Sequence, residues 1–239
     1  MRALCVIYPR TSSVTYRMKY YSLTEACGTS ETGSLYPQTD GMFGEYDFNS
    51  KDSIYQLNRT TIPESVTDFG VIKIGHSAKL TDVISTALIS SAGLIVSEKL
   101  KIILEGSKLQ KSVFIKLKLN HRSIILENYY RLFVENEDRL KRVDFERSSF
   151  KIKRASKDLG EALIASEGEF YEKLASVQKE SIANLIVPSR LITKAFDCDL
   201  FTNPFGTSLI ISEKLKNKLE DEKITGIKIE ELKNIEISE

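Results

Sequence analysis

The strongest constraint on the fold is an octapeptide that occurs twice. Residues 94–101 read LIVSEKLK and residues 209–216 read LIISEKLK, 115 positions apart, with Val96 against Ile211 as their only difference. Each copy runs from an apolar trio through a serine and a glutamate into leucines at helical spacing. Such a repeat predicts the same local structure in two places, which is either scaffold or part of a functional site.

The residues of the repeat favour a scaffold. Ser97 and Ser212 stand just before helical patterns, where a serine hydroxyl accepts a hydrogen bond from a free N–H of the first turn. Glu98 and Glu213 place negative charge at the positive end of the helix dipole. Alternating runs at 113–119 and 226–232 then predict strands. Each copy therefore predicts a strand-like lead-in, a capped helix, a short turn and a strand, with no need for a nucleophile, base or ligand.

The remaining patterns place helices and strands in blocks. We expect a strand at 71–74, a helix over 79–93 that ends at Gly93, and a largely helical stretch from 157 to 184. Further strands are expected at 4–8, 14–23, 124–127, 129–135 and within 143–153. Without strict β-α-β alternation, the fold class is α+β, with mixed, mostly antiparallel sheets and packed helices. We expect a single domain over 1–239, which divides at most into lobes 1–155 and 156–239.

Composition narrows the partners and the compartment. The formal net charge of +1 argues against a general nucleic-acid binder. Three scattered cysteines without a C-x-x-C motif favour a reducing compartment, and no apolar run reaches the roughly 20 residues that a membrane helix needs. We therefore expect a cytoplasmic protein that binds neither membranes nor nucleic acids.

Catalytic and cofactor patterns are sparse. Gly75-His76-Ser77 could seat a base beside a hydroxyl with Asp82 to orient it, and His121 is the second histidine. No phosphate-binding glycine motif occurs, and isolated Cys and His residues give no zinc spacing. We thus expect no catalytic, cofactor or metal site. Two alternatives stay open, an enzyme that uses His76 or His121 and a nucleic-acid-binding module that uses the basic strip, residues 99–122.

Three segments together resemble a known family. Residues 81–105 (TDVISTALISSAGLIVSEKLKIILE), 127–150 (ENYYRLFVENEDRLKRVDFERSSF) and 198–232 (CDLFTNPFGTSLIISEKLKNKLEDEKITGIKIEEL) are similar, in this order, to immunity proteins of bacterial polymorphic-toxin systems. The resemblance covers about three quarters of the chain. It implies a non-enzymatic, cytoplasmic inhibitor that binds one cognate toxin domain and has no cofactor.

A contact surface for such a partner would use aromatic anchors. Seven of the ten tyrosines lie at or before Tyr55, and the last 19 residues carry six acids against three lysines. An acidic end could cover a basic nuclease groove and speed association. The expected partner-binding residues are Tyr20, Tyr21, Tyr46, Phe48, Tyr55, Glu230 and Glu231.

Overall fold

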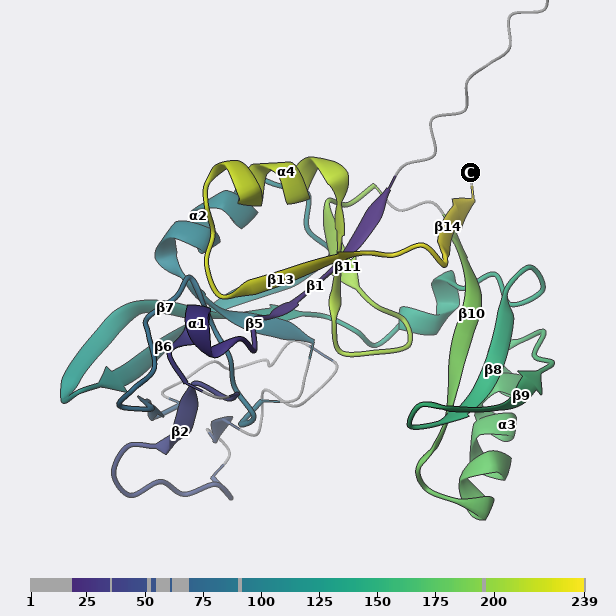
Figure 1. Cartoon of the computed structure of the whole chain (residues 1–239), viewed down its shortest axis with the longest axis horizontal. Coiled ribbons are helices and arrows are strands. Elements are labelled where there is room, and N and C mark those ends of the chain that lie inside the picture. Colours follow the sequence, from purple (N-terminus) through teal and green to yellow (C-terminus); the bar gives the residue numbers. More distant parts are fainter. Residues whose placement is uncertain are drawn as a thin grey trace, which may run out of the picture.

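The computed structural model describes residues 19–34, 36–50, 53–54, 61, 69–89, 92–194 and 197–238. Helices packed on mixed and antiparallel sheets confirm the α+β class (Figure 1). The strand predicted at 4–8 and the first part of that at 14–23 lie outside the described residues.

A six-stranded sheet has the order β2-β3-β6-β7-β5-β4. Helix α2 connects β5 to β6, and the short helix α1 precedes β2. The pair β3–β6 is parallel and the other neighbours are antiparallel. The bounds are α1 (Thr29–Thr32), β2 (Thr39–Met42), β3 (Val71–Ile74), β4 (Val83–Ile84), β5 (Gly93–Ser97), α2 (Glu98–Glu105), β6 (Ser112–His121) and β7 (Ile124–Val134).

Two four-stranded sheets have the orders β11-β12-β1-β13 and β14-β10-β8-β9. Helix α4 connects β12 to β13, and helix α3 lies between β9 and β10 in the chain. The bounds are β1 (Tyr20–Glu25), η2 (Arg139–Arg142), β8 (Ser149–Arg154), β9 (Lys157–Ala162), α3 (Glu167–Glu180), β10 (Asn184–Lys194), β11 (Leu200–Thr202), β12 (Leu209–Ser212), α4 (Glu213–Asp221), β13 (Ile227–Glu231) and β14 (Ile235–Ser238).

The three sheets contain one arrangement twice. The six-stranded order β4-β5-β7-β6-β3-β2 is matched strand by strand by β11, β12, β1, the consecutive pair β13 and β14, β10 and β8. Strands β13 and β14 together take the place of the long strand β6. Every corresponding neighbour pair has the same direction, parallel for β3–β6 and β10–β14 and antiparallel for the rest. The chain is therefore a duplication, which we describe as copy 1 (residues 19–121) and copy 2 (residues 124–238).

The first strands of the two copies are exchanged. Strand β1 opens copy 1 but pairs with β12 and β13, whereas β7 opens copy 2 but pairs with β5 and β6. Their sequences correspond, YYSL at 20–23 and YYRL at 129–132. Tyr21 stands opposite Ile211, and Tyr130 stands opposite Val96, at the one position where the octapeptides differ. Each copy thus supplies the strand that completes the sheet of the other.

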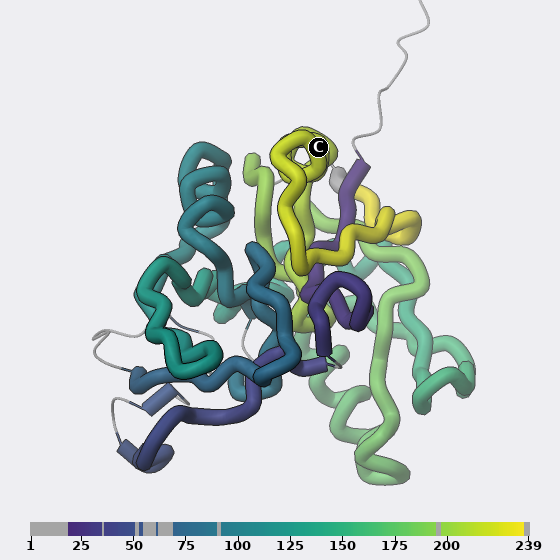
Figure 2. The backbone as a smooth tube through the Cα atoms, turned by 60° about the vertical axis from the view of Figure 1, so that its left-hand side comes forward, coloured from purple at the N-terminus to yellow at the C-terminus, as the bar shows by residue number. Residues whose placement is uncertain are grey.

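Eight strands form a barrel-like ring around one core. The N–H of Val83 donates to the carbonyl of Thr225 ahead of β13, and the N–H of Leu200 donates to the carbonyl of Lys108 ahead of β6. These bonds join β4-β5-β7-β6 to β11-β12-β1-β13 at both outer edges. The enclosed apolar core draws side chains from both copies. Helices α2 and α4 lie side by side over one end of the ring (Figures 1 and 2), where Lys218 Nζ donates to the Ile103 carbonyl.

The helix caps confirm the prediction for the repeat. Ser97 Oγ accepts the N–H of Leu100 at 3.2 Å, and Ser212 Oγ accepts the N–H of Leu215 at 3.2 Å. Each hydroxyl also donates to an aspartate, Ser97 to Asp82 at 2.7 Å and Ser212 to Asp199 at 2.9 Å. The octapeptide is therefore part of the scaffold in both places.

The aspartates also link the two copies. Asp82 of copy 1 accepts the N–H of Thr225 in copy 2 at 3.0 Å. Asp199 of copy 2 accepts the N–H of Lys108 in copy 1 at 3.1 Å. Each copy therefore satisfies backbone donors in the turn that follows the helix of the other.

Two predicted helices are wrong in whole or in part. Where a helix was expected over 79–93, residues 79–89 and 92–93 form strand β4, loops and the start of β5, because Val83 and Ile84 point to opposite faces and enter different cores. Residues 157–162 form β9, which pairs with β8, and the helix begins only at Glu167. The strands predicted at 124–127 and 129–135 are one strand, β7, with a register shift on β6 between Leu117 and Leu119.

The candidate boundary at residue 155 does not separate the sheets. Strand β1 pairs with β12 and β13 from beyond it, and β8 pairs with β10 across it. In space, β8, β9, β10 and α3 form a group beside the ring (Figure 1). Among the described residues, no helix is both long and apolar enough to cross a membrane.

Candidate functional site

The first two predicted anchors are buried. Tyr20 is 5% exposed and packs edge-on against Phe201, and Tyr21 is 8% exposed beneath the ammonium group of Lys216. Strand β1 has a neighbour on each side and a core on each face, so its tyrosines pack inside the molecule. Neither ring lies at the surface for a partner to contact, which corrects the prediction for this pair.

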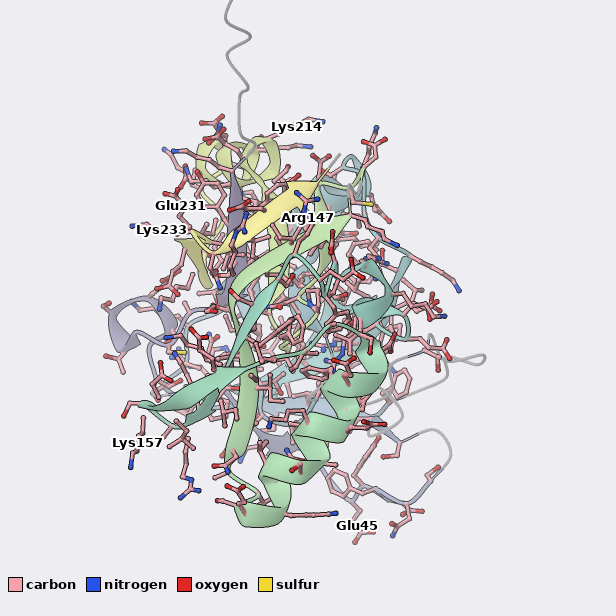
Figure 3. All side chains as sticks on the ribbon, turned by 90° about the vertical axis from the view of Figure 1, so that its right-hand side faces the viewer. Glu45, Arg147, Lys157, Lys214, Glu231 and Lys233 are labelled. Atoms are coloured by element: carbon pink, nitrogen blue, oxygen red, sulfur yellow. The ribbon has the colours of Figure 1, made fainter. Side chains whose placement is uncertain are left out.

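The other predicted contact residues do not gather into one patch. Tyr46 is half-buried against Phe48, which is 36% exposed, and Tyr55 lies outside the described residues. Glu230 and Glu231 are exposed on the edge strand β13. Figure 3 shows Glu45, next to Tyr46, and Glu231 at opposite ends of the molecule. A contact through Phe48 or through the two glutamates stays a prediction.

The histidines come together without the predicted acid. His76 is exposed in the turn after β3, and its carbonyl accepts the Nε–H of Arg122, the neighbour of His121. Burial lowers the pKa of His121, and the charge of Arg122 lowers it further. Asp82 lies elsewhere, bonded to Ser97 and Thr225. The sequence His76-Ser77 with Asp82 therefore does not assemble a nucleophile–base–acid set.

The basic strip, residues 99–122, is largely paired. Its lysines contact carboxylates across the surface, among them Lys108 with Asp197 at 2.7 Å and Lys111 with Glu135 at 2.8 Å. Lys101 and Lys116 pair with Glu105 and Glu127. Paired lysines release fewer counterions when they meet a phosphate backbone, so this geometry does not favour a nucleic-acid site.

A pocket of about 450 Å³ lies at the end of the ring away from α2 and α4. Its walls come from the last residues of β1 and the first residues of β5 and β12, because β1 runs antiparallel to β12. Gly93 and Ser208 hold corresponding positions in the two copies, so the pocket sits where the duplicated halves meet. The lining is Leu23, Thr24, Glu25, Tyr36, Thr86, Ala87, Ile89, Gly93, Leu94, Thr207, Ser208 and Leu209.

Glu25 is the charged group of this pocket. Its Oε2 accepts the N–H of Thr86 at 3.2 Å. Burial raises the pKa of Glu25 to about 7, although the Thr86 bond and the charge of Arg131 act in the opposite direction. Arg131 is 1% exposed behind Gly93, where a Cβ would lie 3.4 Å from its Nη2. Burial lowers the pKa of Arg131 to about 10.

Exposed apolar side chains mark a second region, residues 157–183, which we call the β9–α3 segment. Leu163 is 91% exposed and Ile182 is 87% exposed, the two highest values among the large apolar residues that the structure describes. Tyr171 on α3 is 50% exposed. Helix α3 buries only a narrow stripe, Phe170 and Val177, against the sheet. It lies on the side of the molecule away from α2 and α4 (Figures 1 and 2).

Sequence reasoning missed both regions. Glu25 could have been found by comparing its strand with the second tyrosine strand, where Val134 holds the corresponding place. Leu163 and Ile182 fell within a predicted amphipathic helix, so their exposure carried no signal.

As for known proteins, no protein-family model matches this chain, and a comparison with curated proteins found no match.

Proposed function

We propose that the protein is an immunity protein that binds a cognate toxin domain in the bacterial cytoplasm and blocks it stoichiometrically, without catalysis. The observation that carries the proposal is that the motif residues are structural, whereas the exposed apolar side chains lie on a different part of the molecule. The octapeptide residues that resemble the immunity family cap and support the fold, while the most exposed apolar side chains lie on the β9–α3 segment.

The β9–α3 segment suits a protein partner. When a second protein covers large apolar groups that were exposed to water, binding is favoured by about 25 cal/mol per Å² of buried apolar surface. The segment also carries six acids against three lysines, so a basic partner surface would complement it. A stable inhibitor needs roughly 1,200–2,000 Å² of buried surface with a few anchors at its centre. Leu163 and Ile182 are candidates for such anchors.

Co-expression tests the proposal. A toxin domain encoded beside the gene is induced in cells with and without this chain, and growth is measured. We expect growth only when the chain is present. If no such domain is neutralised and the purified chain binds none of them, the proposal is wrong.

A paired substitution tests the surface. Leu163→Asp with Ile182→Asp should weaken toxin binding at least about tenfold, because apolar anchors are replaced by charge. Ile102→Asp is the control, since Ile102 is 63% exposed on α2 at the other end of the molecule. All three side chains are exposed, so thermal unfolding should stay unchanged. Equal affinities for both variants would contradict this contact surface.

A further inference from the structure

The ring pocket combines an apolar wall with one carboxylate. Leu23, Leu94 and Leu209 come from its strands, while Thr207 and Ser208 add hydroxyls from the β11–β12 loop. Tyr36 is 49% exposed at this pocket and donates its hydroxyl to the Thr86 carbonyl at 3.0 Å. Mouths of β-barrels are frequent binding sites when a few polar groups converge on apolar walls.

Glu25 breaks the internal symmetry. In copy 2 the corresponding strand position is Val134, which is 1% exposed in the ring core. The scaffold therefore accommodates an apolar residue at this place. A half-buried carboxylate here gives the ring no salt bridge among the described residues, and its ionised form is penalised by burial. Charged groups held at such a cost are typical of binding sites.

We propose that this pocket receives a basic side chain of the bound toxin domain, with the Glu25 carboxylate as its counter-charge. This inference rests on the proposed function and names one anchor of that interface. A lysine or arginine side chain has an apolar stem and a charged head, which match the leucine wall and the carboxylate. Tyr36 also lines this pocket, and an aromatic ring there would attract a cation that lies over its face.

The other charge nearby does not occupy the site. Arg131 lies behind Gly93 and is not part of the pocket lining, so an entering group meets the carboxylate first. An anion would be repelled by the Glu25 carboxylate, and a neutral side chain would bury that carboxylate further without adding a positive charge to the Thr86 N–H that it already accepts. The pocket lies at the end of the ring away from α2 and α4, and helix α3 also lies away from those two helices (Figure 1), so one partner could contact both regions.

Protonation of Glu25 should make the affinity for a cation depend on pH. A cation binds the ionised carboxylate, and the pKa of free Glu25 is about 7. Affinity should therefore rise about tenfold from pH 6 to pH 8 and then level off. Glu25→Gln removes the charge without changing the size of the side chain, so it should remove this pH dependence.

The first experiment uses a small probe. Nα-acetyl-L-arginine amide is titrated into the full chain while the carboxyl ¹³C signal of Glu25 is followed by NMR. We expect saturable binding that weakens at least about tenfold in Glu25→Gln and stays unchanged in Glu222→Gln, an exposed glutamate beside α4. Nα-acetyl-L-glutamine amide is the neutral control. Equal binding of both probes, or binding that survives in Glu25→Gln, would overturn the inference.

The second experiment separates the two proposals. The affinity of the toxin domain is measured for the natural chain, Glu25→Gln and Glu222→Gln at pH 6 and pH 8. Equal affinity for all three would overturn the anchor and leave the immunity function standing. Glu25-dependent binding of the arginine probe without any toxin neutralisation would support a cation site and refute the immunity function. A thermal melt of each variant shows that it is folded.

Discussion

Copy 1 and copy 2 have corresponding residues at the positions that support the fold, and they have different residues at the solvent-exposed surface and around the pocket. Their serine caps, their aspartates and their strand orders correspond. The copies differ at two positions near one pocket. Copy 1 has Glu25 where copy 2 has Val134, and copy 2 has Arg131 where copy 1 has Ser22. Duplication within one chain thus supplies an internal comparison, because it shows at which positions the shared architecture holds different residues in its two copies.

The outer connections differ as well. Copy 2 carries β9 and α3 between β8 and β10, with Leu163 and Ile182 exposed. In copy 1, Phe43 and Phe48 lie between β2 and β3 and are 51% and 36% exposed. The predicted aromatic contacts Tyr46 and Phe48 therefore belong to the region that corresponds to the β9–α3 segment. Both copies present apolar groups outside the ring at this connection.

The sharpest break in the comparison is Gly93, where copy 2 has Ser208. Gly93 has φ of 136°, and a Cβ there would lie 1.9 Å from the Leu132 carbonyl oxygen. Gly93→Ser should cost about 4 kcal/mol of unfolding free energy, from backbone strain and a clash with β7. Ser208→Gly should cost less than about 1 kcal/mol. Urea unfolding of both variants measures this contrast, and similar losses would show that the copies are equally tolerant here.

A smaller effect on stability is expected at Glu25, whose counterpart in copy 2 is apolar. The pKa of Glu25 is about 7 in the folded chain against 4.5 for the ordinary side chain. The folded state therefore holds the proton more tightly, and stability falls as pH rises from about 4.5 through 7. At 1.36 kcal/mol per pKa unit, the loss is about 3 kcal/mol.

Glu25→Gln should remove that dependence. Compared with the natural chain, the variant should gain about 3 kcal/mol of relative stability between pH 4.5 and pH 8. Chemical unfolding of both proteins at the two pH values gives the difference. Parallel stability curves would mean that Glu25 ionises as an exposed glutamate does.

The smallest effect tests the sameness of the copies. Ser97→Ala and Ser212→Ala should each cost about 2 kcal/mol, because each removes a cap hydrogen bond at 3.2 Å and the bond that the hydroxyl donates to its aspartate. The two losses should agree within roughly 0.5 kcal/mol and add in the double variant, since each serine has its own partners. A loss at one serine only would show that the caps are not equivalent.

The sequence predicted local features better than long-range ones. Ser97 and Ser212 were identified as caps because capping depends on a few neighbouring residues, and the strand at 71–74 and the strands after both helices are confirmed. The helix expected over 79–93 failed because Val83 and Ile84 fit both periodicities, and only pairing with β5 decides between them. Burial of Tyr20 and Tyr21 depends on strands nearly 200 residues away in the chain. The raised pKa of Glu25 likewise needs neighbours that the chain order does not reveal.

The exchanged first strands have a consequence for how the molecule comes apart. The two copies meet covalently at the β6–β7 hairpin, whose turn residues Arg122 and Ser123 both have positive φ. A protease that cut this turn would sever the chain, yet each fragment would still be clasped by a strand that the other fragment lends. The nicked molecule should migrate as one particle in native conditions and as two pieces once denatured.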